Sequence, residues 1–162
     1  MKITKKNRIV AMVAVFAASL FYIIFVGKFE GLTSAKLSNK FEKIEFSEEF
    51  DQLQIEENAK QITKLLSSSK YDEVAEMSEP TLKETLLTKN EDTKKELETI
   101  TKIMTKKGKV KTVSVGNMDA YKIKDNGSEF ALVNLKANYE KGKVKFLLYF
   151  NEQSELIAFK VN

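Results

Sequence analysis

Hydrophobic side chains are most concentrated near the start of the chain. Between Ile9 and Val26 the sequence reads IVAMVAVFAASLFYIIFV and carries no charge. At roughly 1.5 Å per residue, a helix of this stretch spans about 27 Å, close to the roughly 30 Å hydrocarbon core of a bilayer. The pattern therefore predicts a membrane-spanning helix over Ile9–Val26.

The charges around this stretch predict its orientation. Four basic residues and no acidic residue precede it, namely Lys2, Lys5, Lys6 and Arg8. This bias places the N-terminus in the cytoplasm and the rest of a single-pass cell-membrane protein outside. A cleaved signal peptide is the alternative, but the run is longer than a usual signal core, and the nearest small-residue site, Thr33-Ser34-Ala35, lies well beyond it. We expect an uncleaved anchor.

Helical periodicity follows as far as Gly108. Residues 28–47 mix polar and apolar positions and are interpreted as a stalk. Apolar residues then recur every three or four positions, which predicts amphipathic helices. We expect these helices at 48–66 after an N-cap at Ser47, at 71–77, from Pro80 onward, and from Asn90 or Asp92 to about Lys106.

Beyond Gly108 the period changes from about 3.6 to 2, which predicts strands. Turn residues at 125–127, 140–142 and 151–154 divide this part into four strands of an antiparallel meander, with a bulge near Gly116. Helices followed by such a sheet indicate an α+β fold. We predict an N-terminal transmembrane helix and then a cone-like domain of three to four helices on a four-stranded antiparallel sheet. The boundaries are 1–27 for tail and anchor, 28–47 for the stalk and 48–162 for the extracytoplasmic domain.

The charge balance argues against nucleic-acid binding. The chain has 27 basic and 23 acidic residues and a net charge of +4. Because four basic residues precede the apolar stretch, the part beyond it is neutral overall and shows no footprint for phosphates. Lysine is frequent and arginine occurs once, a bias typical of AT-rich genomes that favours a Gram-positive bacterial source.

Several packing motifs resemble a known superfamily. They are the Ser69–Glu73 step, the helix end at Lys107–Val110, the alternating strand Val144, Phe146, Leu148 and Phe150, and the final Leu156, Phe159 and Val161. Together with the order of elements, they resemble a bacterial domain of unknown function in the nuclear-transport-factor-2-like, or cystatin-like, superfamily. The resemblance implies a pocket between a concave sheet and its helices. Some members of the superfamily are isomerases or dehydratases, and others are binding or scaffold domains.

Candidate reactive side chains are few. The chain has no Cys and no His, so thiol chemistry and the commonest metal ligand are absent. Asp119 and Tyr121 are two residues apart on one expected strand and supply a carboxylate and a phenol, as an isomerase-like site requires. Without a third partner, this pair is better explained as an ordinary bulge and strand. We predict no catalytic residue, no metal site and no cofactor.

Four tyrosines are candidates for lining a pocket: Tyr71, Tyr121, Tyr139 and Tyr149. Aromatic residues at period 2 more often pack in the core or across strands, so core packing is the competing interpretation.

We consider four functions, in the following order. The first is a non-enzymatic, membrane-tethered binding module whose partner is an envelope protein or peptide. The second is a structural subunit of an envelope assembly such as a conjugation channel, in which the domain forms homo-oligomers. The third is an isomerase or hydratase, and an immunity or exclusion protein is a fourth.

Overall fold

The computed structural model describes residues 40–162. They form five strands and four helices in the order β1 (Phe41–Ile44), α3 (Gln52–Ser67), α4 (Tyr71–Glu76), α5 (Pro80–Thr88), α6 (Glu91–Lys107), β2 (Val110–Ile123), β3 (Glu129–Tyr139), β4 (Gly142–Phe150) and β5 (Leu156–Val161). The predicted membrane helix Ile9–Val26 and most of the predicted stalk lie outside the described residues. Within residues 40–162, no helix has the length and apolar character that crossing a membrane requires.

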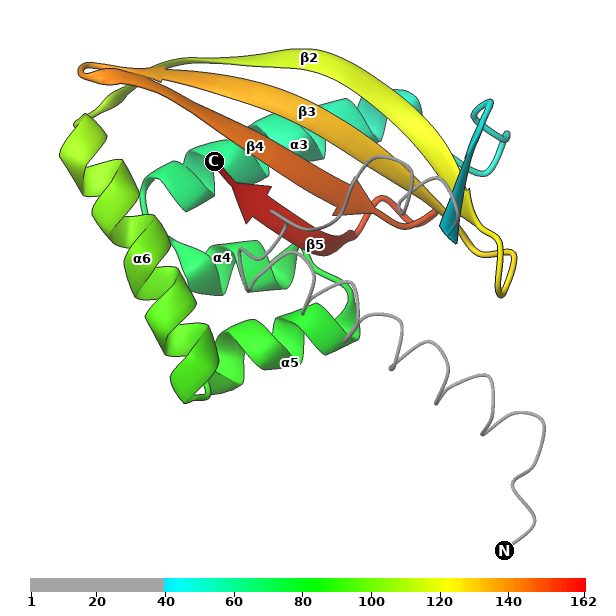
Figure 1. The fold of residues 1–162 in the computed structure, drawn as a ribbon, viewed down its shortest axis with the longest axis horizontal. Coiled ribbons are helices and arrows are strands. Elements are labelled where there is room, and N and C mark those ends of the chain that lie inside the picture. The colour runs from blue at the N-terminus through cyan, green and yellow to red at the C-terminus, as the bar shows by residue number, and fades with distance from the viewer. Residues whose placement is uncertain (1–39) are drawn as a thin grey trace, which may run out of the picture.

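The strands form one antiparallel sheet in the order β1-β2-β3-β4-β5. The α+β class and the presence of four helices are thus confirmed (Figure 1). The predicted bulge is present, since the β2–β3 register shifts between Val115 and Asn117. The apolar strand β4 is an interior strand, although β3 occupies the middle of the sheet.

The prediction of four strands was wrong, because the sheet has a fifth strand, β1. This strand lies within the segment interpreted as a stalk and pairs with the far end of β2, from Phe41 opposite Ile123 to Ile44 opposite Ala120. Four residues with two adjacent charges carry too little alternation for a sequence pattern to identify. The pairing with β2 supplies the hydrogen bonds that make this segment a strand.

The helix ends follow their capping residues, with one displacement from the prediction. Helix α3 starts at Gln52 instead of residue 48, and the cap is Asp51, whose side chain accepts a hydrogen bond from the Gln54 amide at 3.0 Å. The segment before it forms a turn in which the Phe50 amide donates to the Ser47 carbonyl oxygen. Pro80 begins α5 as predicted, and of the two predicted caps of α6, Asn90 and Asp92, Asn90 is the one that caps the helix.

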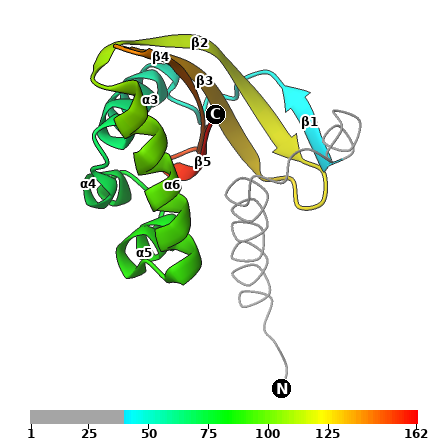
Figure 2. The ribbon, with the colours of Figure 1, turned by 60° about the vertical axis from the view of Figure 1, so that its left-hand side comes forward.

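The four helices cover one face of the sheet, and the core lies between these two layers (Figure 2). On β3 the odd-numbered residues from Ala131 to Tyr139 point to this core, and so do the even-numbered residues of β4 from Val144 to Phe150. The phenylalanines 146 and 150 are fully buried. We call the opposite side of the sheet the outer face.

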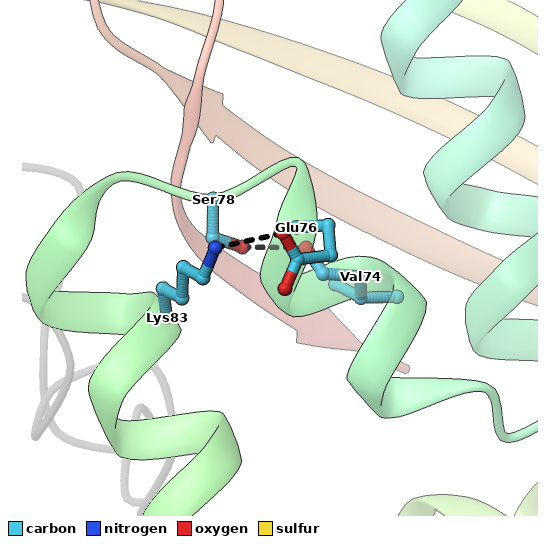
Figure 3. A network of polar contacts seen from close by, with 4 residues as sticks. All are labelled: Val74, Glu76, Ser78 and Lys83. Carbon is cyan, nitrogen blue, oxygen red and sulfur yellow. Dashed lines mark hydrogen bonds and ion pairs between the residues drawn. The ribbon is translucent and has the colours of Figure 1, made fainter.

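The connection between α4 and α5 fastens the helical layer to the edge of the sheet. The buried Ser78 hydroxyl donates to the Val74 carbonyl oxygen at 2.8 Å, and the Lys83 ammonium lies 2.7 Å from the Glu76 carboxylate (Figure 3). Ser78 also forms a parallel bridge with Leu156 of β5. These contacts close the edge of β5 at its first residue.

Candidate functional site

The four candidate tyrosines lie on two opposite sides of the sheet. Tyr71 and Tyr139 belong to the core between helices and sheet, whereas Tyr121 and Tyr149 lie on the outer face. Strand alternation explains this division for the sheet residues, because Tyr149 is adjacent to the core residues Leu148 and Phe150. The structure therefore divides the four tyrosines between the two sides of the sheet and does not gather them into one site.

The hydroxyl groups of the two core tyrosines form hydrogen bonds with neighbouring helices. The Tyr139 hydroxyl oxygen lies 2.6 Å from Ser67 Oγ and donates to Met104 Sδ at 3.0 Å. Burial raises the pKa of Tyr139, and the hydrogen bond with Ser67 partly opposes this shift. The Tyr71 hydroxyl donates to the Leu97 carbonyl oxygen at 3.0 Å. Both phenols therefore tie α6 to other elements of the core.

Tyr71 also lines an open groove of about 360 Å³ beside α6. The wall of this groove includes Lys89 and Lys94, but each of these lysines has an acidic partner. Lys89 Nζ lies 2.8 Å from Asp72 Oδ1, and Lys94 Nζ lies 3.5 Å from Glu91. Because two of its three lysines are already paired and the third, Lys102, lies beside Glu98 in the lining, the groove is a weak candidate for a ligand site.

The pair on the outer face belongs to an aromatic cluster that spans four strands. Phe130 stacks on Tyr121 at 5.6 Å, contacts Tyr149 at 5.9 Å and meets Phe41 edge-on at 5.4 Å between ring centroids. Burial, with a smaller effect of the neighbouring Tyr121, raises the pKa of Tyr149 to about 12. This cluster holds β1 against the sheet.

Asp119 and Tyr121 share the outer face, but the carboxylate of Asp119 is already engaged. One of its oxygens lies 2.6 Å from Lys43 Nζ and the other accepts a hydrogen bond from Asn117 at 2.7 Å. Its pKa is lowered, chiefly by the hydrogen bond with Lys43. A general base of the isomerase type needs an apolar site that raises the carboxylate pKa, so this geometry does not favour such chemistry.

A group of lysines without acidic partners lies at one end of the sheet. There the C-terminal end of α6, the start of β2 and the β3–β4 turn meet (Figure 1), and the Lys141 amide donates to the Lys107 carbonyl oxygen. We call this region the basic end. It comprises Lys106, Lys107, Lys109, Lys111, Lys136, Lys141, Lys143 and Lys145. Within residues 40–162, none of these eight lysines forms an ion pair with an acidic side chain.

One acidic residue, Glu140, lies in the turn of the basic end. Its carboxylate accepts a hydrogen bond from the Lys109 amide at 3.0 Å, so it serves the backbone of the turn. All lysines of the basic end except Lys107 are exposed. The region thus presents a field of positive charge to its surroundings.

Three of these lysines are packed together on the outer face. Lys136 of β3 lies directly opposite Lys145 of β4, and Lys143 lies opposite the neighbouring Asn138. The charge of Lys143, with a smaller effect of Lys145, lowers the pKa of Lys136. We call Lys136, Lys143 and Lys145 the lysine triad.

The sequence analysis missed the basic end, although a signal for it was present. The segments 99–118 and 130–151 contain nine lysines, eight of which form the basic end, and one glutamate, while the part of the chain beyond the apolar stretch is neutral overall. The neutral charge averaged over this part of the chain concealed the local excess of lysine. A count of charge by segment detects it, and the fold then brings the two segments to one place.

A comparison with protein families finds one match. Residues 59–159 match a family described as "Protein of unknown function (DUF3887)". The matched part is more than half of the chain. The chain belongs to this family.

The DUF3887 match extends from the middle of α3 to β5. It therefore includes the basic end and the candidate tyrosines, and β1 lies before it. No curated protein matches the chain.

The fold of this DUF3887 protein is similar to a solved structure, "NMR structure of protein from Ruminococcus gnavus ATCC 29149". The two share 23% identity and a TM-score of 0.54, and the match covers 72% of this chain and 95% of the other. At this identity the likeness establishes the fold alone. The expectation of an uncharacterised bacterial domain is thereby confirmed.

Proposed function

We propose that this protein is a membrane-tethered, extracytoplasmic binding module that takes an anionic ligand at its basic end. The apolar stretch Ile9–Val26 with its one-sided basic flank supports the tether. The nuclear-transport-factor-2-like likeness is part of the same proposal, and the helical layer on a twisted antiparallel sheet is in keeping with it.

The observation that carries the proposal is the basic end. Lysine charges on a protein surface are ordinarily interspersed with acidic ones, and one lysine of α3 and one of α5 form the ion pairs Lys60–Glu56 and Lys83–Glu76. The eight lysines of the basic end have no such partner among the described residues. Self-repulsion within such a patch destabilises the folded state, and an anionic ligand removes the repulsion.

Neither the outer face nor the core offers a site that favours catalysis. The best carboxylate candidate, Asp119, is paired with Lys43 and has a lowered pKa. The region where the superfamily forms a pocket is filled by packed side chains, including Phe146, Phe150 and Phe159. Binding at a surface requires neither a reactive carboxylate nor an interior cavity.

The position of the basic end suits a partner away from the anchor. The described chain begins next to β1, which pairs with residues Ala120–Ile123 of β2. From there to Val110 the strand extends for roughly 30 Å at about 3.3 Å per residue. A tether that precedes β1 therefore joins the sheet at the end opposite to the lysines.

Thermal unfolding of the full chain in a neutral detergent tests this function. We expect an anionic polymer such as inorganic polyphosphate to raise the unfolding temperature, because a ligand that binds only the folded state stabilises it. The increase should shrink as salt is added. Polylysine and a neutral glycan are the controls. Stabilisation by the neutral glycan, or by none of the probes, contradicts the proposal.

A second candidate, a self-assembling structural subunit, is favoured by the free edge of β2. Strand β1 pairs with β2 only from Ala120 to Ile123. Within residues 40–162, residues 110–119 of β2 therefore pair with one strand, β3, and their other edge has no strand partner. An open strand edge is a template for pairing with a second copy. The two register shifts and the flanking lysines of this edge oppose such pairing, so this candidate ranks second. Light scattering that gives a concentration-dependent oligomer supports it.

A further inference from the structure

The lysine triad is a local conflict in an otherwise well-paired sheet. Like charges directly opposite each other on neighbouring strands destabilise the pairing. Lys136 and Lys145 stand in this relation, and Lys143 extends the same outer row two residues along β4. No acidic side chain lies in the two rows that contain them, Thr112–Asn138–Lys143 and Ser114–Lys136–Lys145. The three lysine charges therefore do not stabilise the strand pairing of the free protein.

The neighbours of the triad are neutral groups already turned toward one another. Asn138 Nδ2 donates to Thr112 Oγ1 at 2.7 Å, and the Ser114 hydroxyl donates to the Lys136 carbonyl oxygen at 3.3 Å. These bonds fix the polar surface of β2 and β3 beside the triad. The three lysines are exposed and lie beside these hydrogen-bonded residues.

The triad lies on the open outer face of the sheet and not in a cavity. Such a surface suits an extended ligand that lies across strands, whereas a small anion is held best when a pocket surrounds it. Successive side chains on one face of a strand are about 7 Å apart, so the triad offers several charges in sequence. A linear polymer with regularly repeated anionic groups engages all three at once.

We take phosphate as the anion, because a lysine ammonium group binds a phosphate as a point charge from any direction and does not need the planar fork with which arginine binds carboxylates and phosphates. The basic end is built entirely from lysine. Its position opposite the β1 end of the sheet favours a polymer in the surroundings over the surface of the bilayer that holds the anchor.

We propose that Lys136, Lys143 and Lys145 bind consecutive phosphates of a linear phosphate polymer. This inference rests on the proposed function, because it names the ligand class and the central contacts of the basic end. The other lysines of the basic end add long-range attraction.

The test is the affinity of the full chain, in neutral detergent, for fluorescently labelled inorganic polyphosphate over a series of salt concentrations. The triple variant K136Q/K143Q/K145Q is compared with K64Q/K95Q/K102Q, which loses the same charge outside the basic end. We expect the triad variant to lose at least roughly tenfold in affinity and its salt slope to fall by about 2, as expected for three lost phosphate contacts. The control variant should change by less than about twofold. The triad variant must also unfold at a temperature no lower than the wild type.

Each result that contradicts the proposal identifies which part of it is wrong. Equal losses in the two triple variants overturn the triad as the site and leave the proposed function standing. Wild-type protein that binds no anionic polymer overturns both. Tighter binding to polyglutamate than to polyphosphate overturns the phosphate assignment. Triad-dependent binding to phosphatidylglycerol vesicles without binding to polyphosphate overturns the polymer in favour of a membrane surface.

Discussion

Lys136 and Lys145 lie directly opposite each other on the outer face, on the adjacent strands β3 and β4. The pair has no acidic partner within residues 40–162, and a third ammonium group, that of Lys143, lies beside it. A sheet that needed only to fold would place an acidic or neutral residue at one of these positions. The pair therefore connects the stability of the free protein to its proposed ligand.

Lys145→Gln should stabilise the free protein. The substitution removes the cross-strand repulsion with Lys136, and we expect the free energy of unfolding to rise slightly. Urea denaturation of the full chain in detergent at low salt measures this change. Lys64→Gln, on the exposed side of α3, is the matched control and should leave the free energy nearly unchanged. A decrease for Lys145→Gln means that the lysine stem contributes more by packing than its charge costs.

The raised pKa of Tyr149 predicts an alkaline limit to stability. The folded state holds this phenol neutral to about pH 12, against a usual value of 10.0. The resulting stabilisation is complete below about pH 10, and it is lost as the pH rises toward 12. Ultraviolet absorbance should show a late tyrosine titration near pH 12 that Tyr149→Phe removes.

The matched variant for this titration is Tyr121→Phe. It should keep the late step at a slightly lower pH, because the charge of Tyr121 adds to the shift at Tyr149. A late step that survives in Tyr149→Phe assigns the raised pKa to another phenol.

Tyr139→Phe should weaken the junction between β3, α3 and α6. The hydroxyl contacts Ser67 Oγ at 2.6 Å and Met104 Sδ at 3.0 Å. Its removal should cost about 0.5–1.5 kcal/mol, because a buried hydrogen bond contributes about that much. Without the phenol, Ser67 gives its single hydroxyl proton to the Thr63 carbonyl oxygen, which limits the loss.

A double-mutant cycle with Ser67→Ala measures this junction by chemical denaturation. Residues in direct contact are coupled, so the double variant should lose less than the sum of the two single losses. Strict additivity means that the two hydroxyl groups act independently.

Gly108→Ala should destabilise the protein at the start of the basic end. Gly108 has a φ of 79°, and a side chain there meets the Glu140 carboxylate. We expect a loss of at least about 1 kcal/mol, since alanine at positive φ is strained and the carboxylate must move from the Lys109 amide. Thermal unfolding measures the loss. Gly116→Ala is the control, because Gly116 has no positive φ and its nearest contact, the Asn134 carbonyl oxygen, is at 3.5 Å. Equal losses at the two positions contradict this account.

Local signals in the sequence predicted most of the described elements. Pro80, Asn90 and Gly108 mark helix ends through backbone geometry and capping, and the change to period 2 marks the sheet. The start of α3 was misplaced because Ser47 and Asp51 are equally good caps by sequence. The contact of Phe46 with Phe50, at 5.7 Å between ring centroids, accompanies the turn that precedes the later start.

The candidate site was much less accessible to sequence reasoning. The four tyrosines were proposed as residues that line a pocket, but for the three that lie on strands one residue of difference in strand parity decides which face each of them occupies. Asp119 was recognised as a carboxylate beside Tyr121, but its partner Lys43 is 76 positions away in the chain and belongs to the missed strand β1.

The sequence by itself determined the order of the four helices and of strands β2 to β5, the α+β class and the turns, because these depend on interactions between residues a few positions apart. The tertiary structure decided which faces the tyrosines occupy and where the lysines gather. The segments 99–118 and 130–151 are each only moderately basic, and the pairing of β2, β3 and β4 brings them to one end of the sheet. Charge acts through space, so the part of the chain beyond the apolar stretch, which is neutral on average, presents a polarised surface only when it is folded.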